Sequence, residues 1–278
     1  MTGELRLVRE LLDRFGTGSG DEVWLGDDAA VVTPPTGQLL LAVDPVVAGV
    51  HFDEGVPAAD VGWNAVARNL SDVAAMGGRP LHLLVSLVVP PSSPWPIEAV
   101  VDGVAEAAAD AGCRVVGGDT SGGPVLVVTV AVTGTVDGEP VRRTGARPGD
   151  ALLVSGPLGA KRGRVPARLA AGTAARRGGA TAMIDLSDGL PLDLRRLAEA
   201  SGVGVELDEP LPVADGAGWD DGEGYELLFA VADPARAGAA FAAAGLPAPL
   251  AVGRCVADTR RLRLGAGPLP EGGWAHRF

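Results

Sequence analysis

The chain has 278 residues, of which 47% are hydrophobic and 4% aromatic, and 35 acidic against 23 basic residues give a formal net charge of −12. This length and apolar content suffice for two domains of ordinary size, and the acidic balance argues against a nucleic-acid groove or an anionic membrane surface. No apolar run reaches the roughly 20 residues of a membrane span, and the charged first 15 residues do not read as a signal peptide. We therefore expect a cytoplasmic protein that binds neither nucleic acid nor membrane.

The first half of the chain predicts alternating helices and strands. A charge-free strand over 125–136 would leave a hazardous edge or face unless it is paired, which predicts a homodimer. The elements expected before it are a helix over 5–15, strand-like sequence over 23–32, a buried strand over 39–43 that Asp44 and Pro45 end, a helix that Asp60 caps and Gly77 ends, a strand over 81–89, a helix over 97–111, and a strand over 114–116 that leads into a glycine-rich turn over 117–123.

The second half predicts a separate domain. The run Pro148-Gly149-Asp150 reads as a boundary, so the expected domains are 1–148 and 149–278, an N-terminal mixed sheet and a C-terminal α/β domain. The fold class is therefore α/β (α+β). The elements expected from the boundary region onward are a strand that carries Arg142 and Arg143, strands over 151–155, 182–184, 203–207, 250–256 and 261–264, a helix from 190 with Ser187 or Asp188 as its N-cap, and a helix that Asp233 caps. Residues 222–229 are expected to lead into a further strand.

Seven aspartates stand where a strand, turn or helix end could aim them at one place. Each is ordinary by itself, since turns and helix caps alone explain an aspartate beside a glycine. Together they would repel one another unless hard divalent cations bind them, which predicts magnesium with a nucleotide phosphate chain. These residues are Asp27, Asp28, Asp44, Asp72, Asp119, Asp185 and Asp188.

The helix around Asp72 is the part of the chain with the clearest signal. Trp63, Val66, Leu70 and Val73 recur at helical spacing and predict a core stripe, so Asn69 and Asp72 are expected on a polar, ligand-facing side. Asp72 also lies near the helix C-terminus, where the helix dipole disfavours an anion. A compensating positive charge is therefore expected beside it.

Other catalytic classes find little support. The chain lacks a GxxxxGK[ST] loop, a GxGxxG turn after a strand and the protein-kinase motifs. Its three histidines stand in no nucleophile motif, and His82 lies within an apolar strand. Cys113 and Cys255 adjoin apolar runs without a CxxC partner, so they predict small buried side chains.

Several motifs, in order, resemble the thiamine-monophosphate kinases of the aminoimidazole ribonucleotide synthetase-like superfamily. They cover most of the chain. They are GDDAA at 26–30, Asp44 through GVHF at 49–52, NLSDVAAMG at 69–77, GGDT at 117–120, RTGARPGD at 143–150, DLSDGL at 185–190, GEGYEL at 222–227 and Gly273-Trp274.

The resemblance implies a homodimer in which N-terminal sheets pair into a barrel, and ATP-dependent phosphorylation of thiamine monophosphate to thiamine diphosphate with several Mg²⁺ ions. By motif match, the implied residues fall into four overlapping groups. The metal ligands are Asp28, Asp44, Asp72, Asp119, Asp185 and Asp188, the nucleotide contacts Gly118, Asp119, Arg143 and Ser187, the substrate contacts His51, Glu223 and Trp274, and the catalytic residues Asp72, Asp119 and Asp188.

The sequence departs from the family pattern at three positions. Val43 replaces the hydroxyl residue that is usual before Asp44, and Gly224 replaces the acid that is usual after Glu223. Ala275 interrupts the usual aromatic-Asp-His-Phe ending. The segments 156–180 and 213–221 also look short. Two alternatives follow: a related ATP-dependent synthetase, against which the positions of both cysteines argue, or a degenerate ATP-binding protein without turnover.

Overall fold

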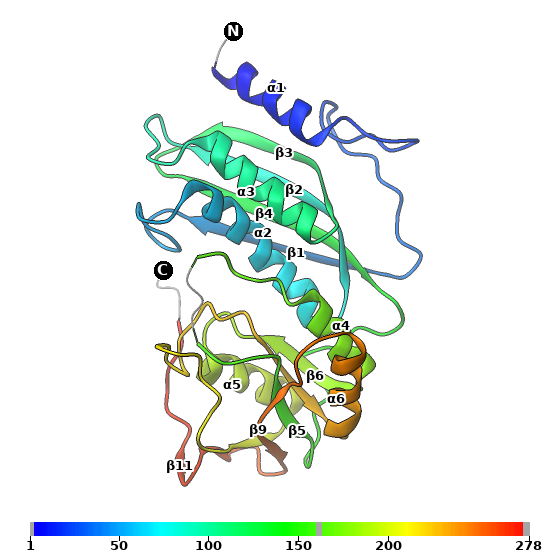
Figure 1. Ribbon diagram of the computed structural model, residues 1–278, viewed down its shortest axis with the longest axis vertical. Coiled ribbons are helices and arrows are strands. Elements are labelled where there is room, and N and C mark those ends of the chain that lie inside the picture. The colour runs from blue at the N-terminus through cyan, green and yellow to red at the C-terminus, as the bar shows by residue number, and fades with distance from the viewer. Residues whose placement is uncertain (1–2, 160–162, 275–278) are drawn as a thin grey trace. The chain divides into compact units, whose positions relative to one another are not determined.

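The computed structural model describes residues 3–159 and 163–274, and the chain divides into two compact units (Figure 1). Unit 1 comprises Met1–Leu70 and Pro80–Thr135, and unit 2 comprises Ser71–Arg79 and Val136–Phe278. The expected domain boundary between residues 148 and 149 stays a prediction. None of the helices in the described part of the chain is long and apolar enough to cross a membrane.

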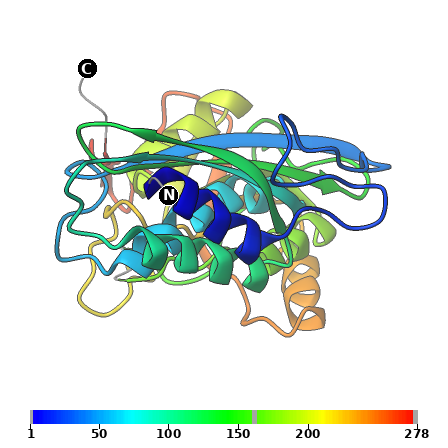
Figure 2. The same cartoon turned by 90° about the horizontal axis from the view of Figure 1, so that it is seen from above.

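Unit 1 is built on a four-stranded sheet in the order β1-β4-β2-β3, with α2 and α3 on one face, as Figure 2 shows. The valines at 128, 130 and 132 of β4 are buried, while the residues between them are only partly buried, as the period of a strand requires. The elements are α1 (Gly3–Phe15), β1 (Gln38–Val47), α2 (Ala58–Ala75), β2 (Arg79–Val89), α3 (Ile97–Asp110), β3 (Arg114–Gly122) and β4 (Val127–Val136).

Helices α2 and α3 cross with their backbones in close approach. A methyl group at Gly103 would overlap the carbonyl oxygen of Ala59, and one at Gly62 would overlap that of Val100. Glycine at both positions therefore lets the two helices pack tightly enough to bury Val100 and Val104.

The second face of this sheet carries exposed apolar side chains. On β1, Leu39, Leu41 and Val43 are 52%, 71% and 60% exposed, and Leu84 of β2 is also exposed. The expectation that 39–43 is a buried strand that ends at Asp44 is wrong, because β1 lies at the sheet edge, presents these side chains outward and continues to Val47. The long strand β4 lies between β1 and β2, so it leaves no free edge.

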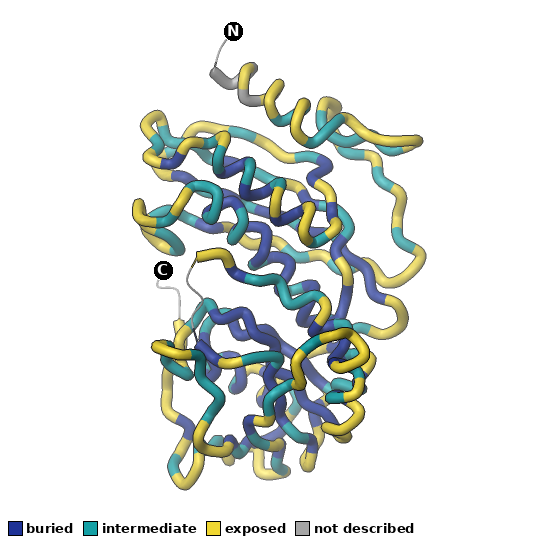
Figure 3. The backbone as a smooth tube through the Cα atoms, viewed as in Figure 1, coloured by how far each residue is buried: buried dark blue, intermediate teal, exposed yellow. Residues whose placement is uncertain are grey.

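Unit 2 is built on a seven-stranded sheet in the order β11-β10-β7-β9-β5-β8-β6. Leu152, Ile184 and Leu228 pack with α5 in one core, whereas their chain neighbours Leu153, Met183, Leu227 and Phe229 pack with α4 and α6 in a second core, so each sheet face has its own helix cover. In Figure 3 much of the chain of this unit's central strands has the colour of buried residues. The elements are β5 (Ala151–Val154), α4 (Leu169–Arg177), β6 (Ala180–Asp185), α5 (Leu190–Ser201), β7 (Gly204–Leu207), β8 (Leu227–Val231), α6 (Pro234–Ala243), β9 (Leu250–Val256), β10 (Leu262–Leu264) and β11 (Gly267–Pro268).

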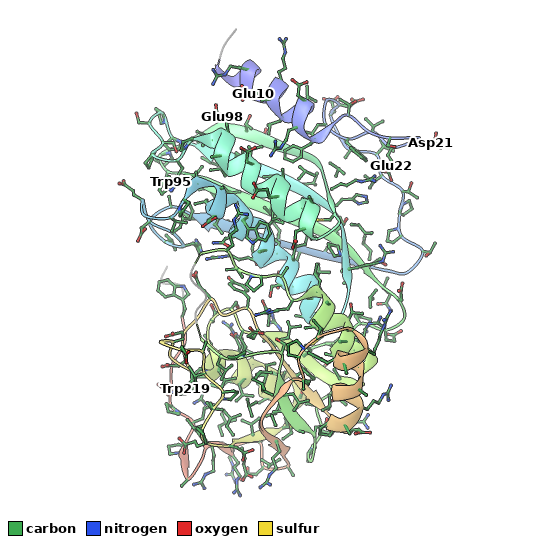
Figure 4. The ribbon with its side chains drawn as sticks, in the orientation of Figure 1. Glu10, Asp21, Glu22, Trp95, Glu98 and Trp219 are labelled. Carbon is green, nitrogen blue, oxygen red and sulfur yellow. The ribbon has the colours of Figure 1, made fainter. Side chains whose placement is uncertain are left out.

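Two expected elements of unit 1 differ in the structure. Residues 23–32 form a loop with one bridge between Val23 and Val31, because Glu22, labelled in Figure 4, accepts hydrogen bonds from the Thr33 backbone and the Trp24 indole. Residues 117–122 form no turn but continue β3, in parallel register with β2. The absence of a side chain at Gly118 permits this pairing, since a methyl group there would overlap the Val85 carbonyl.

One of the predicted helix caps is present, whereas the others and one predicted strand are not. Asp60 lies in the first turn of α2 without capping it, because the helix already begins at Ala58. The N-cap of α5 is Gly189, so neither Ser187 nor Asp188 caps that helix. Arg142 and Arg143 lie in irregular chain rather than a strand. Asp233, in contrast, caps α6 as predicted, with its carboxylate accepting N–H groups of Ala235 and Arg236.

Candidate functional site

Two of the predicted metal ligands line one cavity in unit 1. Asp28, on the loop after Gly26, and Asp119, on β3, both border a cavity of about 810 Å³ over the outward face of the sheet. Gly118, a predicted nucleotide contact, borders it as well. The sequence therefore identified three residues that the fold of unit 1 brings to the same cavity.

Asp44 is held in place by Asn69 of α2. The Asp44 N–H donates to the Asn69 carboxamide oxygen at 2.9 Å, and the Asn69 amide donates to the Asp44 carbonyl at 3.3 Å and to the Ala65 carbonyl at 2.9 Å. Asn69 is fully buried, so the expectation that it faces a ligand is wrong. Its role is to hold the backbone of β1 while the Asp44 residue stays exposed.

His51 stands in a loop that aromatic packing anchors. Its Nδ1 accepts the Val47 N–H at 3.0 Å, so a neutral imidazole carries its proton on Nε2. The next residue, Phe52, packs edge-on against Trp95 with ring centroids 5.0 Å apart. The Trp95 indole, labelled in Figure 4, donates to the Val56 carbonyl at 3.0 Å. This predicted substrate contact therefore has a defined orientation.

An apolar cavity of about 240 Å³ lies under α1 in unit 1. Leu12 and Phe15 of α1, Val104 of α3 and Val115 of β3 line it on the apolar side. Its polar end is the segment 117–120, which includes Gly118 and Asp119. The cavity has the apolar walls and few polar groups that are typical of a small-molecule site.

Unit 2 brings together a second group of predicted residues through backbone hydrogen bonds. The Glu223 N–H donates to the Ser187 carbonyl at 2.7 Å, and the Trp274 N–H donates to the Asp188 carbonyl at 2.8 Å. The Asp185 carboxylate accepts the Ser71 hydroxyl at 2.7 Å, one residue before Asp72 on α2. The 185–188 segment thus connects predicted metal, nucleotide and substrate residues.

The turn that carries Glu223 is conformationally strained. Glu223 and Tyr225 have φ angles of 60° and 50°, in the left-handed region that non-glycine residues seldom adopt. Such strain persists only where surrounding structure enforces it, and it concentrates at ligand-binding sites. The Tyr225 N–H donates to the Leu186 carbonyl at 2.9 Å, which is one of the bonds that hold this turn.

Asp188 also takes part in an ion-pair network on α5. Its carboxylate lies 2.5 Å from Nη1 of Arg196, which also lies 2.7 Å from the Asp193 carboxylate. The second Asp193 oxygen accepts the Asp188 N–H at 2.9 Å. Burial raises the pKa of Asp193 to about 6, and the hydrogen bond from Asp188 opposes that rise. Gly189, the N-cap of α5, has a φ angle of 103°, and a side chain there would overlap the Asp220 carbonyl.

Sequence reasoning missed Glu226, a buried acid in unit 2. It is fully buried, accepts the Ser155 hydroxyl at 2.6 Å and pairs with Arg168. An acid directly before the uniformly apolar strand 227–231 was the available signal, because a charge at such a position must be paired.

The departure at Gly224 has a packing explanation. A methyl group there would lie 3.0 Å from the Gly159 carbonyl oxygen and 3.5 Å from its carbon. The chain after β5 therefore occupies part of the space of a side chain at position 224. Ala275 lies outside the described residues.

Arg143 lies apart from Ser187 within unit 2. The Arg143 carbonyl accepts the hydroxyl of Ser201, the last residue of α5, at 2.9 Å. Ser187, in contrast, lies just before the N-terminal end of that helix. A helix of 12 residues spans about 18 Å, so the backbones of these two predicted nucleotide contacts lie near opposite ends of α5. Much of the surrounding motif is structural: the Asp150 carboxylate accepts the Arg147 N–H and the Thr181 hydroxyl.

The cysteines are buried, as predicted. Burial raises the pKa of Cys113 to about 11 and that of Cys255 to about 12, so both thiols are neutral and unsuited to nucleophilic chemistry. Within 3–159 and 163–274, no three His, Cys, Asp or Glu side chains form a group that could hold a metal ion by themselves.

The chain is similar to one protein family and to several known enzymes. The family of AIR synthase related proteins, N-terminal domain, matches residues 26–136. The thiamine-monophosphate kinase of Salmonella typhimurium is 33% identical over 96% of this chain and 95% of its own length. That of Rhodopirellula baltica is 37% identical over 76% of each chain. This chain belongs to the thiamine-monophosphate kinase family.

Solved structures agree with the family assignment. The thiamine-monophosphate kinase of Stenotrophomonas maltophilia K279a matches with a TM-score of 0.78 at 30% identity and covers 96% of each chain. A structure of AaThiL complexed with AMPPCP and TMP has a TM-score of 0.77 at 28% identity, over 99% of this chain and 96% of that one. The hydrogenase maturation protein HypE of E. coli, at 22% identity and a TM-score of 0.80, shares the fold alone.

Family membership confirms the fold class and the family resemblance that the motifs carried. The matched segment 26–136 contains GDDAA, NLSDVAAMG and GGDT, and the full-length relatives extend over the motifs of unit 2. The family assignment thus covers motifs that lie in loops, such as GDDAA, and motifs within a strand, such as GGDT in β3.

Proposed function

We propose that this chain transfers the terminal phosphoryl group of ATP to thiamine monophosphate and releases thiamine diphosphate and ADP. The observation that carries the proposal is full-length similarity to proteins named thiamine-monophosphate kinase, at 33% identity over 96% of this chain. A relative with the same fold was solved in complex with AMPPCP, an ATP analogue, and TMP, which we take as the abbreviation of thiamine monophosphate. The chain is accordingly an ATP-dependent kinase rather than a protein of the fold alone.

The acids of both units suit a reaction led by magnesium. Mg²⁺ in proteins is commonly held by one or two carboxylates together with substrate phosphates, so a set of three pre-assembled ligands is not required. Bound ions would supply charge neutralisation of the phosphate chain. The proposed ligands are Asp28, Asp44 and Asp119 in unit 1 and Asp72, Asp185 and Asp188 in unit 2. Their convergence stays a prediction.

The nucleotide is assigned to residues that border the two cavities of unit 1. Gly118 and Asp119 belong to β3 and line both of them. We place the adenine ring in the apolar cavity under α1, because its aliphatic and aromatic walls end at this segment. Arg143 and Ser187 are the proposed nucleotide contacts from unit 2.

Thiamine monophosphate is assigned to His51, Glu223 and Trp274. Trp274 is 53% exposed and offers an indole face to the cationic thiazolium ring, and the Glu223 carboxylate offers an opposite charge. The strained turn of Glu223 supports this role, because the conformation holds a side chain in place at the expense of backbone stability.

The chemistry needs alignment more than proton transfer. A phosphate oxygen of thiamine monophosphate attacks the γ-phosphorus of ATP, and the bond from that phosphorus to the β–γ bridging oxygen breaks, so that ADP leaves with the electron pair. The attacking oxygen is already anionic, which removes the need for a general base. Asp72, Asp119 and Asp188 would act catalytically by holding Mg²⁺, whose charge would align and neutralise the reacting phosphates.

A homodimer is proposed from the outward sheet face of unit 1. Leu39, Leu41 and Val43 on β1 and Leu84 on β2 form a surface that we name the apolar sheet face. Pairing two copies through this face would bury these side chains. A cytoplasmic address is proposed because the reaction consumes ATP and because both cysteines are free.

Product analysis tests the function. The protein is incubated with ATP, Mg²⁺ and thiamine monophosphate, and thiamine diphosphate is separated by chromatography. We expect product only when all three are present. ATP binding without thiamine diphosphate would instead indicate a degenerate ATP-binding protein.

A further inference from the structure

Arg196, a residue that neither the motifs nor the proposed mechanism uses, forms the centre of a charge cluster with Asp188 and Asp193. Its Nη1 lies 2.5 Å from Oδ2 of Asp188 and 2.7 Å from Oδ1 of Asp193. Asp193 is 1% exposed, whereas Asp188 and Arg196 are partly exposed. One guanidinium nitrogen thus bridges a buried acid and an acid that solvent can reach.

The bridge closes a ring of contacts. The second oxygen of Asp193 accepts the backbone N–H of Asp188 at 2.9 Å, so Asp193 fixes the main chain of Asp188 while Arg196 fixes its carboxylate. Asp185 adds a third acid to the same segment, three residues before Asp188. Three neighbouring acids need a counter-charge in the free protein, and Arg196 supplies it.

We propose that Arg196 is a positioning residue that takes the place of a cation at Asp188: it holds the Asp188 carboxylate before metal binds and competes with Mg²⁺ for it. The inference rests on the proposed function in so far as Asp188 is a metal ligand. The Arg196 side chain is 42% exposed, so it can turn toward solvent when a divalent cation takes the carboxylate oxygen.

The competition has a definite direction. Replacing Arg196 by glutamine removes a positive charge beside a metal ligand, so the affinity for divalent cations should rise. The same replacement leaves Asp188 and Asp193 without their counter-charge, so the metal-free protein should lose stability. Lysine keeps the charge but lacks the planar guanidinium that reaches both carboxylates. The stability and the cation affinity of Arg196→Lys should therefore lie between those of wild type and Arg196→Gln.

Thermal unfolding of the full chain tests both effects with one matched control. Arg195→Gln removes the neighbouring arginine, which donates to the carbonyls of Leu269 and Pro270 and to no carboxylate in the described residues. In EDTA, we expect Arg196→Gln to lower the melting temperature by about 2–5 °C. In excess Mg²⁺, the loss of melting temperature in Arg196→Gln should be recovered, whereas the loss in Arg195→Gln should remain.

Mn²⁺ binding, followed by the loss of the free-ion EPR signal, provides a second readout. Arg196→Gln should bind Mn²⁺ about two- to fivefold more tightly than the wild type. The inference is overturned if Arg196→Gln shows no loss in EDTA, or if Mg²⁺ stabilises it no more than it stabilises wild type and Arg195→Gln. If wild type makes thiamine diphosphate but Arg196→Gln behaves like Arg195→Gln, the role of Arg196 is refuted and the proposed function stands. If Mg²⁺ restores Arg196→Gln but wild type makes no thiamine diphosphate, the role of Arg196 stands and the proposed function is refuted.

Discussion

The backbone N–H of Trp274 donates to the carbonyl oxygen of Asp188 at 2.8 Å, so the C-terminal segment is joined directly to the loop of a proposed metal ligand. A methyl group at the preceding Gly273 would lie 2.8 Å from that same carbonyl and 2.7 Å from Cβ of Leu192. The close packing places the Trp274 backbone at a definite position while its indole stays exposed. A substrate-binding residue needs this combination of anchored backbone and open side chain.

Trp274→Ala should raise KM for thiamine monophosphate and leave KM for ATP nearly unchanged. An indole beside a cationic thiazolium contributes roughly 0.5 to 2 kcal/mol, about a two- to thirtyfold change in affinity. Trp219→Ala is the control, because Trp219, labelled in Figure 4, packs against the α5 core and should lower the melting temperature instead. A Trp274 variant that melts earlier yet binds thiamine monophosphate normally would assign Trp274 to the fold.

Asp72→Asn should leave the circular dichroism spectrum unchanged and lower kcat by about a hundredfold or more, because the amide keeps the shape and loses the charge that binds metal. Steady-state rates at limiting Mg²⁺ measure the effect. Asp110→Asn, at the exposed end of α3, is the matched control. Near-normal turnover by Asp72→Asn would show a helix residue without a role in catalysis.

Leu41→Asp should convert a homodimer into a monomer. Leu41 is 71% exposed in the middle of the apolar sheet face, and a carboxylate there would be buried without a partner in the paired state. Light scattering at micromolar concentration gives the mass. Val50→Asp, on an exposed loop residue outside this face, should remain dimeric. A wild-type monomer would refute the pairing.

Gly224→Asp, which introduces the acid usual in the family, should destabilise this chain. Its Cβ would lie 3.0 Å from the Gly159 carbonyl, and overpacking of this kind costs about 1–3 kcal/mol. Calorimetry measures the loss. Gly238→Asp on α6, where no atom lies within 4 Å of the added Cβ, controls for the substitution itself. An unchanged melting temperature would contradict the packing explanation of this departure.

Asp193 should make stability depend on pH. Its pKa is raised by burial to about 6 in the folded protein from an ordinary value of 3.8, so the folded state binds the proton more tightly than the unfolded state. The stability that this group contributes is greatest below about pH 4 and is lost as the pH rises through about 6. Urea unfolding in EDTA across this range should show the slope in wild type relative to Asp193→Asn. A constant difference between the two would contradict the raised pKa.

The motifs predicted the family and the fold class because they combine glycines and acids in a fixed order along the chain. Some of them lie in loops, whereas GGDT lies within β3 and Asp44 within β1. Asp28, Gly118 and Asp119 border one cavity, and the 185–188 segment is hydrogen-bonded to the backbones of Glu223 and Trp274. The roles assigned to these residues stay predictions.

Other features depend on partners that are distant in the sequence. The buried role of Asn69 could not be predicted, because its hydrogen bonds go to Asp44 on another element. Likewise, the exposure of 39–43 depends on the position of β1 at a sheet edge, and an apolar run looks the same at an edge and in a core. The bridge of Arg196 to Asp188 and Asp193 follows from helix geometry only once the start of α5 is known.

The central claim is direct phosphoryl transfer from ATP to thiamine monophosphate, and the most direct test measures ADP and thiamine diphosphate in the same time course with Mg²⁺ present. Direct transfer predicts that the two products appear in equal amounts from the first turnover and that neither forms in EDTA. ADP that accumulates without thiamine diphosphate would contradict it.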